Sequence, residues 1–294
     1  MKQTILGAIY LSLAASIWGG MYVVSKYVLD FIPPLTLVWL RFIIAFVVLY
    51  GILKLAEKNQ KKKVTIRKKD WLLFAWIGFI GYFISITCQF IGTKLSDAHT
   101  GSLVTSATPA FMVIFAALIL KEKLTARRLL STIIATIGVI IVIGWDIEIG
   151  SYFIGTIILV GAAITWALLS IYVKIASIQF SSLVITTYAI FFSLFFITPF
   201  MIWELQAASI GTVNTYVILG VLYLGIVSTA GAFFLWNKGL ELLDASIGSL
   251  FFFFQPIVGS LLGWLLLNET LNSNFFIGGI LIICSVLITT FEKK

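Results

Sequence analysis

The sequence predicts an all-α integral membrane protein whose ten transmembrane helices form two inverted five-helix repeats. Three observations predict this fold. Hydrophobic residues make up 61% of the 294 residues and charged residues only 11%, which lies far outside the range of soluble globular domains. The apolar residues gather in ten runs, most of them close to the roughly 20 residues that a helix needs to cross the hydrocarbon core. The second half of the chain also repeats the first.

The ten runs define the predicted spans. They lie at about 5–25, 35–55, 71–91, 100–120, 129–145, 153–173, 183–203, 215–236, 246–267 and 274–291. The fifth is the shortest. The first lacks a convincing small-residue cleavage site, so we expect a retained helix there and not a removed signal peptide.

The repeat has a nearly constant offset of 148 residues, falling to 147 in its later part. It pairs identical residues in the two halves: Trp18 with Trp166, Lys26 with Lys174, Gly92 with Gly239, Asp97 with Asp244, Pro109 with Pro256 and Glu122 with Glu269. Apolar matches are cheap in so hydrophobic a chain, but matches at Trp, Asp, Pro and Glu are not. We expect the copies at 1–146 and 147–294. With five spans in each, the second copy enters the membrane upside down, a recurring design of secondary transporters.

Lys and Arg predict the orientation, because cytoplasmic loops carry an excess of positive charge. With the N-terminus inside, seventeen of the twenty Lys and Arg residues fall on the inner side, while Lys26 and Lys94 fall outside and Arg41 lies within the second span. We therefore expect a multi-pass protein of the cell membrane with both termini in the cytoplasm. The net charge of +8 does not indicate nucleic-acid binding, because the basic residues occupy short loops and not one polar face.

Several other classes of protein are excluded by what the spans lack. Cys88 and Cys284 both fall in apolar runs and no Cys/His cluster occurs, so we expect no disulfide, no metal and no cofactor. A membrane enzyme would need clustered His, Asp or Glu at membrane depth, and none is present. A channel would need a continuous ring of polar residues, whereas those of this chain are scattered. No Asp or Glu falls in the middle of a predicted span, which counts against binding of organic cations.

The polar residues within spans are the first candidates for substrate binding, because a polar group in lipid is costly. Arg41 is the most deeply embedded charge. Its guanidinium would face a cavity and bind a substrate carboxylate bidentately, or it would snorkel to the interface or clamp loop carbonyls; both interpretations stay open. Gln89 and Gln255 are candidates for hydrogen bonding to substrate.

Aromatic residues at helical spacing are the second group of candidates. Trp18 and Tyr22 lie four residues apart and share a helix face. A similar stripe in the eighth span includes Phe233 and Trp236, and Trp166 repeats Trp18. Such rings could wall a cavity; packing is the alternative. We therefore expect the substrate-binding residues to be Trp18, Tyr22, Arg41, Gln89, Trp166, Trp236 and Gln255.

Pro109 and Pro256 lie midway along the fourth and ninth spans and are predicted helix breaks. Each frees the carbonyl four residues earlier, at Thr105 and Phe252. A freed carbonyl would face a cavity, or the break would only shape the bundle.

Acidic residues flank the same two spans. Asp97 and Asp244 precede them and are expected to cap the helices that follow. Glu122 and Glu269 come after them and are expected to cap or bridge into the next helix.

The chain resembles the EamA-type exporters of the drug/metabolite transporter superfamily. The residues that carry the resemblance are Trp18-Gly19, Arg41, Pro109 followed by Lys121-Glu122-Lys123-Leu124, and Pro256 followed by Asn268-Glu269-Thr270-Leu271. It covers essentially the whole chain and implies a central cavity lined by both repeats and export of amino acids and other small metabolites. The second copy has Ala189 where the first has Arg41, so recognition by arginine would be one-sided.

The expected function is therefore that of a secondary transporter, not an enzyme, which exports amino acids or related compounds across the plasma membrane by alternating access. Its partners are a small-molecule substrate and the lipid bilayer, and a homodimer stays open. Multidrug or organic-cation efflux is the alternative function, and a passive channel is the third interpretation. The sequence leaves the substrate and the coupling ion open.

Overall fold

The computed structural model describes residues 2–60, 66–143, 150–267 and 273–290, and every regular element in these ranges is helical. The first half contains α1 (Lys2–Val28), α2 (Pro34–Gln60), α3 (Lys68–Ile77), η1 (Gly78–Ser85), α4 (Ile86–Leu95), α5 (Ala98–Thr105), α6 (Thr108–Ile119) and α7 (Ala126–Ile143). The second half contains α8 (Ser151–Ala176), α9 (Ser182–Ala207), α10 (Thr215–Leu222), η2 (Tyr223–Gly231), α11 (Ala232–Leu242), α12 (Ala245–Ser249), η3 (Leu250–Phe253), α13 (Phe254–Leu267) and α14 (Ser273–Thr290).

Within these ranges, 7 helical stretches are long and apolar enough to cross a membrane, and α6 is a shorter apolar helix. The 7 are Gln3–Val28, Pro34–Lys58, Lys68–Leu95, Ser151–Ala176, Ser182–Ala207, Thr215–Leu242 and Ala245–Leu266. The expected boundary between the copies at 146 and 147, and the motif Asn268-Glu269-Thr270-Leu271, lie outside the described residues. A helical membrane protein that crosses the bilayer several times is the architecture that these helices support.

Pro109 lies at the start of a helix, whereas Pro256 lies inside one helical stretch, at a change from a 3₁₀ turn to an α-helix. Pro109 is in the first turn of α6, where a missing N–H leaves no bond unmade. The Thr105 carbonyl is not left free to face a cavity. It accepts a hydrogen bond from the Thr108 hydroxyl at 2.6 Å. Pro256 is in the first turn of α13, after the tighter 3₁₀ turn of η3. The helix is interrupted before Pro109 and restarts at α6, whereas before Pro256 it only tightens into the 3₁₀ turn η3 and continues.

Helices α1 and α8, which begin the two copies, run in opposite directions. A side chain at Gly7, near the start of α1, would meet Leu242 and Leu243 at the end of α11. The end of α8 lies at the same place, because Lys174 donates to the Leu243 carbonyl at 2.7 Å. Conversely, a side chain at Gly155, near the start of α8, would meet Ser96 after the end of α4.

Lys26 and Lys174 make equivalent contacts at opposite ends of the bundle. Lys26 donates to the Thr93 and Ser96 carbonyls at the end of α4, at 3.3 and 2.7 Å. Lys174 donates to the carbonyls of Leu240 and Leu243, 147 residues further on, both at 2.7 Å. Each ammonium satisfies the unpaired carbonyls of a helix end. The sequence repeat is therefore also a repeat of contacts, and it is antiparallel.

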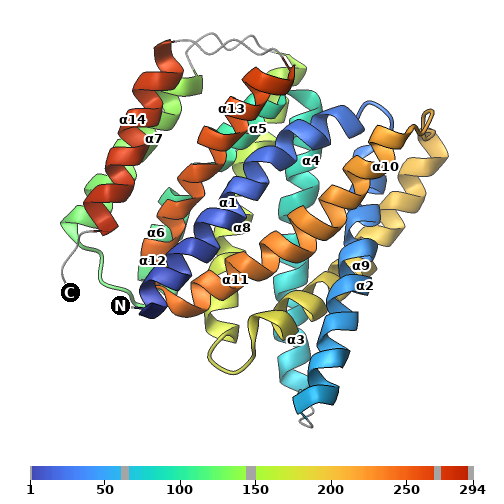
Figure 1. Ribbon diagram of the computed structural model, residues 1–294, viewed down its shortest axis with the longest axis horizontal. Coiled ribbons are helices and arrows are strands. Elements are labelled where there is room, and N and C mark those ends of the chain that lie inside the picture. The colour runs from blue at the N-terminus through green and yellow to red at the C-terminus, as the bar shows by residue number, and fades with distance from the viewer. Residues whose placement is uncertain (1, 61–65, 144–149, 268–272, 291–294) are drawn as a thin grey trace.

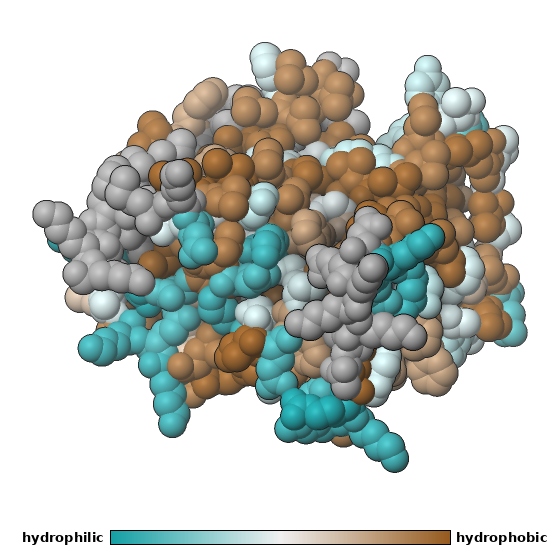
Figure 2. All heavy atoms as spheres, turned by 60° about the horizontal axis from the view of Figure 1, so that its bottom comes forward, coloured by the Kyte–Doolittle hydropathy of each residue, from teal (hydrophilic) through white to brown (hydrophobic). Residues whose placement is uncertain are grey.

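Figure 1 shows how the helices are arranged. Helices α1, α8, α11 and α13 form the middle, α7 and α14 lie together at one edge, and α2 and α9 pack at the other. Helix α1 begins at the lower end of that view, and Figure 2 looks onto this end, where hydrophilic side chains gather between apolar flanks. Lys174 and Arg128 lie at this end, because they contact Leu243 and Asp244 beside the start of α1, and we call it the basic end.

Candidate functional site

A small cavity lies in the middle of the bundle, and each copy supplies half of its lining. The lining residues are Trp18, Met21, Ile86 and Gln89 from the first copy, and Trp166, Phe233, Phe252 and Gln255 from the second. The space that the centre of a water molecule can reach is about 10 Å³, which is room for about one water. The structure therefore describes a nearly closed state of this cavity.

Aromatic rings form most of the wall. Trp18 is at their centre, with ring centroids 5.1 Å from Trp166, 5.8 Å from Phe233 and 5.6 Å from Phe252. Trp236 packs behind this wall, 5.3 Å from Trp18, and its indole N–H donates to the Ser170 hydroxyl at 3.2 Å. Such edge-on and tilted pairs make rigid surfaces for an apolar or planar group.

A chain of neutral hydrogen bonds connects the polar side chains. The Thr105 hydroxyl donates to the Gly101 carbonyl at 2.7 Å, so it must accept from Tyr22 and from the Gln255 amide, each at 2.7 Å. The single proton of the Tyr22 hydroxyl is then donated to Thr105, so the Gln89 amide N–H must donate to the Tyr22 oxygen. The direction of these hydrogen bonds therefore leaves the oxygen of Gln89 unpaired.

Two buried polar atoms of the lining have no hydrogen-bond partner in the part of the chain that the structure describes. They are the Gln89 side-chain oxygen Oε1, an acceptor, and the Trp166 indole nitrogen Nε1, a donor. A buried unpaired group costs about 1–3 kcal/mol. A substrate that offers one donor and one acceptor would remove both penalties.

Arg41 lies one layer behind the cavity and is fully buried. Its guanidinium donates to the Thr229 hydroxyl at 2.6 Å and to the Ser228 hydroxyl at 3.3 Å. Its Cζ atom lies 4.9 Å from the ring centroid of Phe90 and 5.7 Å from that of Phe233. No carboxylate pairs with it among the described residues, so only neutral groups, which are hydroxyls, aromatic faces and the Met21 sulfur, stabilise the charge there.

The predicted site residues therefore occupy two layers. Trp18, Gln89, Trp166 and Gln255 line the cavity, and Tyr22, Arg41 and Trp236 support that lining from behind. Met21 and Ile86 also line the cavity, and nothing in the sequence distinguishes them, because apolar residues carry no signal in so apolar a chain. Met21 connects the layers, because its sulfur accepts from an Arg41 N–H at 3.5 Å. The described residues contain no group of three His, Cys, Asp or Glu that could hold a metal.

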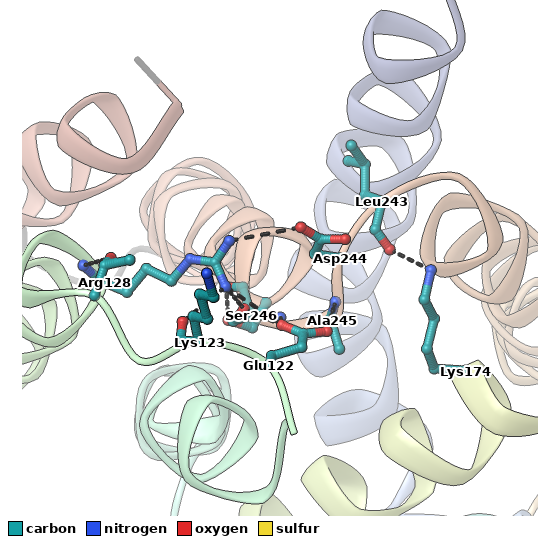
Figure 3. A network of polar contacts seen from close by, with 10 residues as sticks. Glu122, Lys123, Arg128, Lys174, Leu243, Asp244, Ala245 and Ser246 are labelled. Carbon is teal, nitrogen blue, oxygen red and sulfur yellow. Dashed lines mark hydrogen bonds and ion pairs between the residues drawn. The ribbon is translucent and has the colours of Figure 1, made fainter. Parts of the chain in front are cut away.

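A second polar cluster lies at the basic end, away from the cavity (Figure 3). Lys121 has a left-handed φ of 56°, and after this turn Glu122 reaches the start of α12. The Glu122 carboxylate accepts from the backbone N–H groups of Ala245 and Ser246 at 3.0 and 3.3 Å, and from the Ser246 hydroxyl. Arg128 donates to that hydroxyl at 2.7 Å.

Comparison with known proteins connects this geometry to a family. The sequence model of the EamA-like transporter family matches the chain twice, at residues 5–144 and 153–291. The chain belongs to the EamA-like transporter family. The resemblance inferred from the motifs is thereby confirmed, and one match falls in each half of the chain.

Relatives and a solved structure agree over nearly the full length. The chain is 28% identical to the uncharacterized transporter YetK of Bacillus subtilis (strain 168), covering 97% of this chain and 87% of that one. It is 25% identical to an Escherichia coli (strain K12) protein whose name describes an amino-acid metabolite efflux pump, covering 96% and 94%. One solved crystal structure matches with a TM-score of 0.76 at 19% identity, over 97% of this chain and 96% of that one, which supports the fold.

Proposed function

We propose that this EamA-family transporter exports small metabolites that carry a carboxylate, amino acids or related compounds, across the cell membrane. Arg41 is the observation that carries the proposal. A fully buried guanidinium without a carboxylate partner in the described residues is unfavourable. A substrate carboxylate would supply the missing counter-charge through a charge-assisted, bidentate contact.

The cavity lining supports the same class of substrate. The unpaired acceptor of Gln89 and the unpaired donor of Trp166 suit a metabolite with N–H and C=O groups, and the aromatic wall suits its apolar part. Met21 separates Arg41 from the cavity, and its unbranched side chain can be displaced at little cost. The relative named for amino-acid metabolite efflux is compatible with this choice.

Alternating access is the mechanism that we propose. The cavity holds about one water, so substrate can enter only when the copies move apart on one side. Two antiparallel copies around one central site suit such rocking. We propose ten transmembrane helices in two inverted repeats. The basic end and both termini would lie in the cytoplasm, because loops rich in Lys and Arg are retained on the cytoplasmic side of a membrane.

Variants at Arg41 test the substrate class. Cells that overexpress the protein should tolerate toxic amino-acid analogues, and Arg41→Ala should abolish most of that tolerance. Lys94→Ala is the matched control, because Lys94 is exposed and its ammonium donates to the Leu29 carbonyl at 2.9 Å. Arg41→Lys should recover only part of the loss, because an ammonium cannot reproduce the planar fork. All three variants must reach the membrane in equal amounts.

Efflux of a quaternary ammonium dye is the decisive counter-observation. If the protein exports the dye strongly and Arg41→Ala leaves that efflux unchanged, multidrug cation efflux replaces the proposed function.

Reporter fusions test the orientation. A reporter fused after Lys294 should behave as cytoplasmic, and one placed near Asn272 as external; both positions lie outside the described residues. The reverse pattern would overturn the orientation.

A further inference from the structure

A third polar group lies between the cavity and the basic end, centred on Asn237. Asn237 is in α11, one turn beyond the cavity residue Phe233, and it is fully buried. Its side-chain amide donates to the Thr186 hydroxyl at 2.7 Å and to the Tyr82 hydroxyl at 3.0 Å. It therefore joins three helical segments of the bundle.

The orientation of this amide follows from its neighbours. The Thr186 hydroxyl donates its only proton to the Ser182 carbonyl at 2.7 Å, so it must accept from Asn237. The nitrogen of the Asn237 amide therefore faces Thr186, and the oxygen Oδ1 faces elsewhere. This oxygen is buried and has no donor within the described chain. A buried acceptor in this condition favours any ligand that brings an N–H group.

The ring stack places Asn237 directly behind the cavity wall. Its partner Tyr82 stacks on Phe233 with centroids 4.7 Å apart and planes 7° apart, and lies 6.0 Å from Trp166. Phe233 and Trp166 both line the cavity. Movement of these two rings would join the Asn237 group to the cavity, on the side of the basic end.

The other copy shows that the fold does not need an amide at this position. The residue 147 positions earlier is Phe90, which packs against the Arg41 guanidinium. The equivalent of Arg41 is Ala189. The first copy thus has a cation against an aromatic ring, and at the equivalent sequence positions the second copy has an alanine and an amide with an unpaired oxygen. One copy therefore offers a positive charge and the other a hydrogen-bond acceptor.

We propose that Asn237 forms a second substrate contact, on the path between the cavity and the basic end, where its oxygen accepts a hydrogen bond from an N–H group of the transported metabolite. The inference rests on the proposed function and narrows it to carboxylates that also carry an amine. A single amino acid would meet Arg41 and Asn237 in succession, because the two lie on separate helices and are connected through Phe233. The Phe233 ring contacts both the Arg41 guanidinium and Tyr82, the partner of Asn237.

Pairs of compounds that differ only in the amine test this inference. The purified protein is reconstituted in liposomes, and counterflow is measured with L-leucine and 4-methylpentanoate, and with three further amino acids and their desamino acids. The wild-type protein should prefer each amino acid. Asn237→Leu should raise the KM for the amino acids about tenfold, which corresponds to about 1.4 kcal/mol, and leave the KM for the desamino acids unchanged.

A second variant separates recognition from folding. Asn237→Asp keeps an acceptor oxygen in the same volume and should retain the preference for the amine, even if Asn237→Leu fails to fold. Arg41→Ala should weaken both members of every pair.

The outcomes are distinguishable. If the wild-type protein transports the pairs but Asn237→Leu changes the KM of both members equally, or Asn237→Asp loses the preference for the amine, Asn237 has only a structural role and the inference is overturned, while the proposed function stands. If the wild-type protein transports none of the compounds, the proposed function fails and the inference fails with it.

Discussion

The starts of α5 and α12 occupy equivalent positions in the two copies, and both follow an aspartate, yet they are capped in different ways. Asp97 caps its own helix: its carboxylate accepts from the Thr100 N–H at 2.6 Å and from the Thr100 hydroxyl at 3.2 Å. The prediction for Asp97 is confirmed. Asp244 accepts no such bond from α12, so the prediction for Asp244 is wrong.

Glu122 caps α12 in place of Asp244. It comes from the other copy, 123 residues before Ala245 in the sequence. Asp244 instead lies 3.5 Å from Arg128, which also lies 3.5 Å from Glu122. A local cap survives any movement of one copy against the other, whereas a cap supplied by the other copy is broken by it. One repeated motif therefore caps its own helix at one end of the bundle and joins the two copies at the other.

Of these three acidic residues, Glu122 should contribute most to stability, so Glu122→Ala should lower the free energy of unfolding most. It removes four hydrogen bonds to a carboxylate, three from the start of α12 and one from Arg128, and leaves α12 uncapped, so the free energy of unfolding should fall by about 2 kcal/mol. The midpoint of thermal unfolding in detergent measures this loss. Glu57→Ala is the matched control, because Glu57 pairs with Lys54, which is half exposed, and such a pair contributes little. Equal midpoints for the two variants would contradict the assigned cap.

Asp97→Ala should have an intermediate effect. It removes a local N-cap from α5, which costs about 1 kcal/mol. Asp97→Asn should restore most of the stability, because asparagine caps helices about as well as aspartate. Thermal unfolding of both variants, compared with the wild-type protein, decides the point. If Asp97→Asn lowers the unfolding midpoint as much as Asp97→Ala does, the charge of Asp97, and not its hydrogen bonds to Thr100, stabilises this position.

Asp244→Asn should have the smallest effect. Its side chain is 43% exposed and its contact with Arg128 is long, so the pair contributes about 0–1 kcal/mol. The unfolding midpoint should stay close to that of the wild-type protein. A loss greater than that of Asp97→Ala would reverse the ranking and return the capping role to Asp244.

Much of the fold could be predicted from residues that act locally. Apolar runs predicted the helices, and the structure extends them by a few residues at most ends, as α2 continues to Gln60 and α8 to Ala176. Arg41, Gln89 and Gln255 could be selected because a polar residue within an apolar run is visible without knowing its neighbours. Trp18 and Tyr22 share a helix face, as their spacing predicted, but only Trp18 lines the cavity. Spacing along one helix does not show which partner helix covers each residue.

The sequence by itself determined the helical segments, the repeat and its offset, and the gathering of positive charge in particular loops. Each of these depends on composition and order along the chain, and the hydrophobic effect acts on them wherever the helices finally pack. Only the tertiary structure decided that Asn237 keeps an unpaired oxygen, that Arg41 rests on hydroxyls of η2, and that Glu122 and not Asp244 caps α12. These outcomes depend on contacts between helices more than 50 residues apart in the chain, and such contacts are set by how the helices cross.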